Sequence, residues 1–283
     1  MAEQKQAGAG LRGQVAGKTA LSTVGQKGTG LTYRGYDVQE LAEQCEFEEV
    51  AYLILKGELP NQKQLDEYKA KLKKNRGLPQ ALREVLERIP ADAHPMDVMR
   101  TGCSMLGNLE TETDFSQQED QVDRMLAVFS SIICYWYRYS HDGKRVETET
   151  DDDTIGAHFL HLLRDEEPSD LHKQVMNVSL ILYAEHEFNA STFTARVCAS
   201  TLSDIHSCIT GAIGSLRGPL HGGANEAAME MIEKFTDPDD AEQKMLGMLE
   251  RKEKIMGFGH AIYKESDPRN AIIKKWSEKL SKD

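Results

Sequence analysis

The stretch VDRMLAVFSSIICYW, residues 122–136, decides the fold class. Its apolar side chains recur at spacings of three and four residues, which places them on one face of an α-helix. These apolar side chains are Val122, Met125, Leu126, Phe129, Ile132, Ile133 and Trp136. The stretch therefore predicts a long amphipathic helix that packs against a core.

The same spacing returns on both sides of this stretch. Shorter apolar stripes are formed by Leu82, Val85, Leu86 and Ile89, and by Ala228, Met231, Ile232 and Phe235. Residues 171–184 are apolar on most faces, which is typical of a helix buried inside a helical protein.

Helix breakers divide the chain between these stretches. Glycine and proline interrupt the pattern at 57–60 and 77–79, and acidic, polar connections are expected at 107–120 and 141–153. Residues 12–36 are rich in Gly and Thr and predict short strands and turns. Strands do not alternate with helices in the rest of the chain, so the sequence predicts a mainly α protein with about ten helices.

The composition excludes several classes of protein. The chain has 283 residues, 40% of them hydrophobic, and a formal charge of -12. Such acidity disfavours nucleic acid or an anionic membrane as the main partner. No apolar run reaches the roughly 20 residues that span a bilayer. Residues 1–11 predict a flexible start without the apolar core of a signal peptide, so we expect a cytoplasmic protein.

The cysteines predict neither a disulfide framework nor a zinc site. They are odd in number and scattered: Cys45, Cys103, Cys134, Cys198 and Cys208. The last three lie in helical, mostly apolar stretches, and we expect reduced side chains in the core.

Three segments combine a histidine with a break in the helical pattern. The first is AEHEFNAST at 184–192, where Asn189 or Ser191 can cap the next helix beside His186. Taken alone, this segment is explained more simply by a cap with a hydrogen-bonded histidine. The spacing is not HExxH, so a zinc protease site is not supported.

The second segment is LRGPLHGGANE at 216–226, which places His221 among glycines just before an amphipathic stretch. The positive end of a helix favours a neutral imidazole. A neutral histidine can donate a hydrogen bond to a developing enolate oxygen. The alternative is a plain turn between helices, although such a turn has no use for the histidine.

The third segment is KIMGFGHAIYK at 254–264, with Asp-Pro-Arg after it at 267–269. It is not GxGxxG, so a dinucleotide site is not indicated. His260 next to Arg269 suggests a site for a keto acid, in which the histidine polarises the carbonyl and the guanidinium binds a carboxylate. The alternative is a loop with a surface salt bridge.

Together the segments favour condensation chemistry. They supply three histidines and an arginine, but no serine or cysteine on an elbow and no Walker loop. A proton must leave the carbon next to a thioester, and that step needs a base, ideally a carboxylate. A metalloenzyme built on the three histidines is a rival hypothesis, but carboxylates or cysteines at ligand spacing do not accompany them, and we expect no metal.

These segments resemble the citrate synthase family. Its signature GPxHGGAN is filled at 218–225, its G[FY]GHxxY at 257–263 with DPR at 267–269, and its HExNAS-like sequence at 186–191. YRGY at 33–36 and the segment from Glu49 to Pro60 are similar to the family's start. Order and spacing match from about residue 12 to the end.

The resemblance implies a helical homodimer whose large and small domains close over the substrates. Residues 12–221 would form the large domain, and 222–283 the beginning of the small domain, whose remainder is absent. His221 would stabilise the enol of the acyl-CoA, and His260 would polarise the ketone of oxaloacetate. Oxaloacetate would also be bound by His186 and Arg269. The CoA contacts would come from Lys254, Ile255, Met256, Gly257 and Phe258.

Within the family, the chain is most similar to the 2-methylcitrate synthases, which use propionyl-CoA in propionate breakdown and need no cofactor. The similarity lies in residues 135–137, 149–153 and 183–193. Acetyl-CoA as substrate is the alternative, because one methylene in an apolar pocket is worth only about 1–3 kcal/mol. The family's catalytic aspartate lies beyond residue 283, so we expect these 283 residues alone to be inactive. A non-catalytic, CoA-binding relative is the rival from another class.

Overall fold

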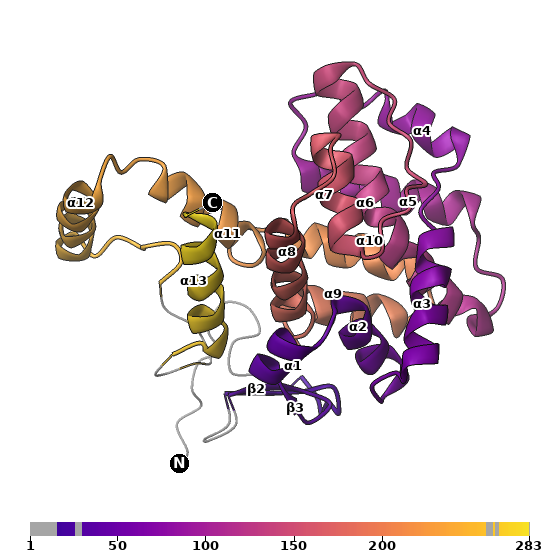
Figure 1. Cartoon of the computed structure of the whole chain (residues 1–283), viewed down its shortest axis with the longest axis horizontal. Coiled ribbons are helices and arrows are strands. Elements are labelled where there is room, and N and C mark those ends of the chain that lie inside the picture. The colour runs from indigo at the N-terminus through magenta and orange to yellow at the C-terminus, as the bar shows by residue number, and fades with distance from the viewer. Residues whose placement is uncertain (1–15, 26–29, 259–262, 264–265, 283) are drawn as a thin grey trace, which may run out of the picture.

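The protein is mainly α-helical (Figure 1). A computed structural model describes residues 16–25, 30–258, 263 and 266–282, and His260 lies outside them. Within these residues, the chain forms three short strands, a 3-10 helix at Phe115–Gln117 and thirteen α-helices.

The strands come first and form an antiparallel sheet in the order β1-β2-β3. They are β1 (Ser22–Val24), β2 (Leu31–Tyr33) and β3 (Tyr36–Asp37). Thr23 pairs with Thr32, and Tyr33 pairs with Tyr36. The helices after the sheet are α1 (Val38–Gln44), α2 (Phe47–Lys56), α3 (Gln62–Lys74), α4 (Gln80–Leu86), α5 (Pro95–Leu109), α6 (Gln118–Asp142), α7 (Ile155–Arg164), α8 (Asp170–Tyr183), α9 (Ala190–Ala199), α10 (Ile205–Leu216), α11 (Gly223–Ile232), α12 (Pro238–Glu250) and α13 (Pro268–Leu280).

The prediction of a mainly α fold is confirmed, but the estimate of about ten helices was too low for the described residues. Helices α1 and α4 have seven residues each, too few for a repeating stripe to stand out. The polar connection expected at 107–120 is also shorter than predicted, because α5 continues to Leu109 and α6 begins at Gln118.

Helix α6 forms the centre of the larger core, as its stripe predicts. Met125, Ile132 and Trp136 are buried, and they pack with residues of α4, α5 and α10. The Trp136 indole donates a hydrogen bond to the carbonyl of Ile89 at 3.3 Å. Because the buried face of α6 is mostly apolar, with Asp123, Ser130 and Ser131 as buried polar exceptions, this single helix organises the surrounding bundle.

A second core joins the two ends of the described chain. Leu31, Tyr33 and Val50 pack there with Ile181 of α8, and Trp276 of α13 packs against them. The Tyr33 hydroxyl donates to the carbonyl of Ile181 at 2.9 Å. The N-terminal strands therefore support the end of α8, where the first histidine segment begins.

Helix α8 is less buried than its sequence predicted. Val178, Ile181 and Leu182 are buried, whereas Tyr183 is 66% exposed. The helix packs with α1, α2, α7 and α13. The expectation of a fully enclosed helix was wrong because these neighbours cover only part of its circumference.

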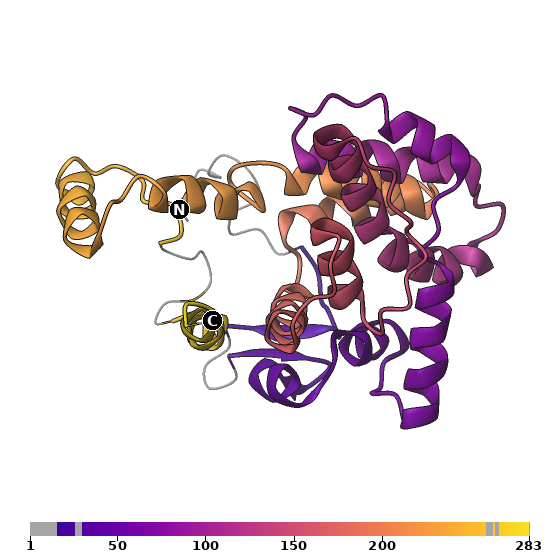
Figure 2. The same cartoon turned by 45° about the horizontal axis from the view of Figure 1, so that its top comes forward.

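Helices α11 and α12 extend away from the body of the protein (Figures 1 and 2). Neither has a buried residue, and apolar side chains on both are more than half exposed: Met229, Ile232, Leu246 and Leu249.

No helix among the described residues is both long and apolar enough to cross a membrane. All five cysteines are free thiols, and Cys198 is only half-buried, contrary to the expected core position.

The buried His158 predicts a specific pH dependence of stability. Its Nε2 lies 3.1 Å from the Ser131 hydroxyl and its Nδ1 lies 2.9 Å from that of Thr150. Burial, assisted by the nearby charge of Arg76, lowers the pKa of His158 from 6.5 to about 3. Below pH 6.5 the unfolded chain binds a proton that the folded chain does not. The free energy of unfolding should therefore fall as the pH drops from 6.5 towards 3, by up to about 1.4 kcal/mol per unit.

Urea denaturation of the wild type and of His158→Gln at several pH values between 7 and 4 measures this contribution. The variant is expected to be less stable at pH 7 but to lose less stability on acidification. If the free energy of unfolding falls equally steeply with pH in both proteins, His158 is not the source of the pH dependence.

Candidate active site

The first histidine segment forms a tight turn between α8 and α9. Glu187 adopts a left-handed conformation with φ of 56°, which is uncommon for a residue with a side chain. Its backbone N–H donates to Glu185 Oε1 at 2.5 Å and to Ser22 Oγ at 3.1 Å. The Ser22 hydroxyl in turn donates to Glu185 Oε1 at 3.0 Å. Strand β1 thus fixes the turn that carries His186.

Asn189 ends this turn as the N-cap of α9, one of the two caps that the sequence allowed. Its Oδ1 accepts a hydrogen bond from the Thr192 backbone at 3.0 Å and lies 2.8 Å from the Ser191 hydroxyl oxygen. The cap fixes Ser191 in the first turn of the helix, where backbone N–H groups have no partner within the helix.

His221 lies against this first turn of α9. The backbone N–H of Ser191 is 3.2 Å from His221 Nε2, and the Ser191 hydroxyl is 2.8 Å from the same nitrogen. A backbone N–H can only donate, so Nε2 must carry the lone pair and Nδ1 the proton. Burial lowers the pKa of His221, which also favours the neutral ring. The predicted neutral imidazole is therefore what the local structure stabilises.

Two glycines after His221 allow the turn to fold back on the end of α10. A Cβ at Gly222 would lie 2.7 Å from the Leu216 carbonyl oxygen, and one at Gly223 would lie 2.9 Å from that of Arg217. Any larger residue would push the turn away from α10. The glycines are therefore required by close approach of the backbone rather than by unusual dihedral angles.

The third segment reaches the first through Tyr263. The Tyr263 hydroxyl lies 3.1 Å from His186 Nε2, and the two rings meet edge to face. Burial raises the pKa of Tyr263 to about 12, with Asp267 adding to the rise and Arg269 opposing it. Arg269 also opposes the rise that burial causes in the pKa of Tyr33. The positive charge of Arg269 therefore acts on both tyrosine hydroxyls.

Arg269 already has a carboxylate partner. Its Nε lies 2.9 Å from Asp267 Oδ1 and its Nη2 lies 2.6 Å from Asp267 Oδ2, so the pair is bidentate. The sequence allowed a surface salt bridge as the alternative interpretation. The pair is more enclosed than that, since the two side chains are only 22% and 25% exposed.

The predicted CoA segment forms a turn beside α11. Ile255 is buried, Gly257 has a φ of 85°, and Phe258 is 67% exposed. A Cβ at Gly257 would lie 3.4 Å from the Cβ of Ala228, so the turn touches the helix that begins just after His221.

The structure thus brings parts of all three segments together. The first segment contacts the second through Ser191 and the third through His186, and the Tyr183 hydroxyl accepts a hydrogen bond from Asn225 at 3.0 Å. Sequence reasoning did not place Ser191 or Tyr263 in the site. Both lie within the histidine motifs, but their partners are 30 and 77 positions away.

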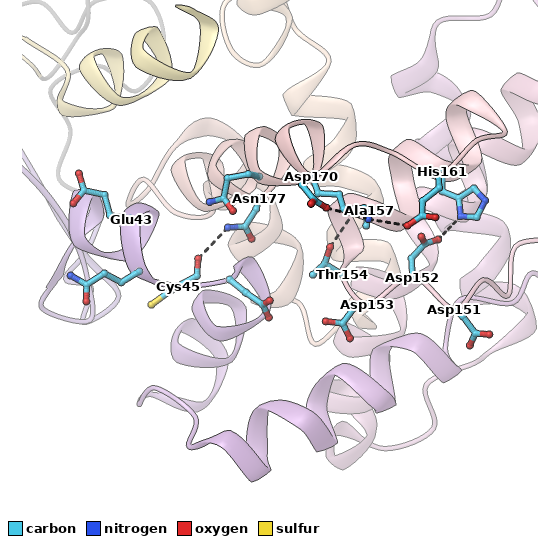
Figure 3. A pocket seen from close by; sticks show the side chains of 15 residues that line it. Glu43, Cys45, Asp151, Asp152, Asp153, Thr154, Ala157, His161, Asp170 and Asn177 are labelled. Atoms are coloured by element: carbon cyan, nitrogen blue, oxygen red, sulfur yellow. Dashed lines mark hydrogen bonds and ion pairs between the residues drawn. The ribbon is translucent and has the colours of Figure 1, made fainter. Parts of the chain in front are cut away.

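A large open groove lies elsewhere, between α1, α7, α8 and the segment before α7 (Figure 3). Its volume is about 830 Å³, and no lining residue belongs to the three segments. Carboxylates dominate its walls, among them Glu43, Asp151, Asp153 and Asp170. Such a surface repels the phosphates of CoA, so we do not place the acyl-CoA there.

Among the described residues, no group of three or more His, Cys, Asp or Glu side chains is arranged to bind a metal ion.

Comparison with known proteins places this geometry in a family. The chain is 76% identical to the 2-methylcitrate synthase of Shewanella oneidensis, over 99% of this chain and 75% of that protein. It is 41% identical to the 2-methylcitrate synthase of Mycobacterium tuberculosis, over 96% of this chain and 69% of that protein. A solved ternary complex of Thermoplasma acidophilum citrate synthase with carboxymethyl coenzyme A and oxaloacetate superposes with a TM-score of 0.89. It is 32% identical and covers 96% of this chain and 72% of its own.

The sequence profile for "Citrate synthase, C-terminal domain" matches residues 10–283, nearly the whole chain. The helical fold, the three histidine segments and these matches agree, and the chain belongs to the citrate synthase family.

Proposed function

We propose that this protein condenses propionyl-CoA with oxaloacetate and water to give 2-methylcitrate and CoA, in propionate breakdown through the methylcitrate cycle. The observation that carries this proposal is the 76% identity to a 2-methylcitrate synthase across 99% of the chain. Acetyl-CoA as the preferred substrate, which would make the protein a citrate synthase, is the second candidate. It draws support from matches such as the 43% identical citrate synthase 2 of Bacillus subtilis.

His221 has the geometry of an electrophilic catalyst for the acyl-CoA. Its Nε2 is occupied by Ser191, so its Nδ1–H is the group that can reach a ligand. As a base removes a proton from the α-carbon, negative charge develops on the thioester oxygen, and a donor aimed at that oxygen stabilises it. The enol carbon then attacks the ketone of oxaloacetate, and water cleaves the thioester to release CoA.

Oxaloacetate is assigned to the place where the first and third segments meet. His186 and Arg269 bind its polar groups, and His260 polarises the ketone. The local support is the His186–Tyr263 contact and the enclosed guanidinium of Arg269. Asp267 uses Nε and Nη2 of that guanidinium, so a substrate carboxylate binds on the Nη1 side or displaces Asp267.

The CoA moiety is assigned to the turn from Lys254 to Phe258. The turn touches α11 just after His221, and its left-handed glycine exposes backbone groups to a ligand. Lys254 adds a positive charge for a phosphate. These contacts would place the thioester near Nδ1 of His221.

We further propose a cytoplasmic homodimer with a large domain up to residue 221 and a small domain from residue 222. Exposed apolar side chains in the last turn of α9 and just after it support the dimer, because Val197 is 52% exposed and Leu202 is 74% exposed. The extension of α11 and α12 from the body supports the domain boundary (Figure 1).

The acyl preference is open to direct measurement. The full-length protein is expected to prefer propionyl-CoA to acetyl-CoA in kcat/KM by roughly 10 to 200-fold, because the two differ by one methylene. Release of CoA, monitored with a thiol reagent at saturating oxaloacetate, gives both values. A preference for acetyl-CoA would identify the protein as a citrate synthase, and no turnover with either would refute the proposed reaction.

A further inference from the structure

We propose that the first turn of α5 holds the His221 turn in its working position, with His94 and Asp97 as positioning residues. The inference rests on the proposed function, because it concerns how His221 is presented to the acyl-CoA. Neither residue touches the imidazole. They act through Glu226, five residues after His221, and Arg217, four residues before it.

His94 makes the first of these contacts. Its Nε2 lies 3.0 Å from both carboxylate oxygens of Glu226. Its Nδ1 accepts a hydrogen bond from the Met96 backbone at 3.1 Å, as the N-cap of α5. That bond requires a lone pair on Nδ1, so the proton is on Nε2 and points to the carboxylate. The cap therefore orients the ring that holds Glu226.

Asp97 makes the second contact from the same face of α5, since residues three apart are neighbours on a helix. Its Oδ2 lies 3.7 Å from Arg217 Nε, and its Oδ1 lies 3.0 Å from Arg100 Nη2. One helical turn thus contacts the chain on both sides of His221, through hydrogen bonds to Glu226 and a longer ion pair to Arg217 that is not a hydrogen bond. We call this arrangement, formed by His94, Asp97, Arg217 and Glu226, the α5 clasp.

The clasp matters because apolar packing is sparse in this part of the chain. None of residues 214–232 is buried, and Leu220, beside His221, is 83% exposed. Apolar packing therefore contributes little to the position of the turn. Besides the clasp, this part of the chain is held by the close approach of Gly222 to the end of α10 and by the contacts of His221 with Ser191 and of Asn225 with Tyr183.

We expect the clasp to fix the position of His221 rather than to stabilise the fold. The clasp side chains are between 21% and 48% exposed, and such ion pairs contribute little to the free energy of unfolding. A displacement of about 1 Å at a reacting group, however, can lower a rate about 100-fold. If the start of α11 shifts, the His221 ring moves away from the Ser191 N–H and no longer keeps its proton on Nδ1.

Three variants of the full-length protein separate these effects. Glu226→Ala removes the carboxylate, whereas Glu226→Gln keeps an oxygen that accepts from His94. His94→Asn keeps a side chain that caps α5 but is too short to reach Glu226. Glu230→Ala is the matched control, because Glu230 is an exposed glutamate one turn further along α11.

With propionyl-CoA and oxaloacetate, Glu226→Ala and His94→Asn are each expected to lower kcat about 10 to 100-fold. The KM values and the melting temperature should change little. Glu226→Gln should restore most of the rate, and Glu230→Ala should match the wild type. Combining His94→Asn with Glu226→Ala should cost little more than either alone, because both remove one contact.

The ¹⁵N signals of the His221 ring, assigned by comparison with His221→Gln, test the clasp independently of turnover. The wild type and Glu230→Ala should show a neutral ring protonated on Nδ1, and Glu226→Ala should shift towards the other tautomer. Wild-type kcat in Glu226→Ala, or an unchanged His221 signal in a variant that loses activity, would overturn the clasp. A wild type without turnover refutes the proposed reaction, while the ring signals still decide whether the clasp holds.

Discussion

Replacing His221 with alanine is expected to lower kcat at least about 100-fold, the scale for losing one donor to a developing oxyanion. The structure gives the reason, because Ser191 holds Nε2 and leaves Nδ1–H as the donor. The fold should survive, since His221 lies in a turn and is only half-buried. Release of CoA at saturating propionyl-CoA and oxaloacetate measures the rate.

His141→Ala is the control for this experiment. His141 lies exposed at the end of α6, stacked on Tyr137, and its loss should leave kcat unchanged. Ser191→Ala should have a smaller effect than His221→Ala, because the backbone N–H that fixes the tautomer remains. A His221→Ala protein with near-normal kcat would remove His221 from the mechanism. The sequence predicts an equally large loss for His260→Ala.

Gly222→Ala is expected to be almost as damaging, although it adds only a methyl group. The new Cβ would lie 2.6 Å from Leu216 Cδ1 and 2.7 Å from the Leu216 carbonyl oxygen. The side chain can rotate away, but the carbonyl belongs to the end of α10 and cannot. The turn must therefore move outward and take His221 with it, and we expect kcat to fall about 100-fold.

Gly218→Ala provides the matched control within the same turn. A Cβ there meets a single neighbour, the Ser215 carbonyl oxygen at 3.4 Å, and needs only a slight adjustment. Gly222→Ala should keep a melting temperature close to that of the wild type, because the turn is not buried. If both variants retain full activity, close approach to α10 is not what positions His221.

Much of the fold was predictable because it depends on local signals. The apolar stripe of α6 marked the centre of the core, and Gly57 and Asn61 mark where α2 ends and α3 begins. Asn189 was recognisable as a cap from its place before a helix. Short helices and partial burial were not predictable, because both depend on which neighbours happen to cover a segment.

The three candidate segments were recognisable from the sequence, but their arrangement in space was not. A histidine marked each segment, and glycines marked the second and third, whereas the contacts of His221 with Ser191 and of His186 with Tyr263 depend on helix packing. The sequence around His94 contains only a weak sign of its role. Histidine is an unusual cap before a proline that opens a helix, since Ser, Thr, Asp and Asn are the usual choices.

The two cores also have a consequence for the order in which the nascent chain folds. The core around α6 draws its residues from 78 to 213, whereas the core around Tyr33 needs Trp276 of α13 as well as the first strands. Contacts between distant positions form late, because closing the long intervening loop costs entropy. During synthesis on the ribosome, the buried part of both cores can therefore assemble before α13 is made, because among the described residues no buried member of the second core lies beyond Leu182. Until α13 emerges, the side of the second core that Trp276 covers should be open to chaperones.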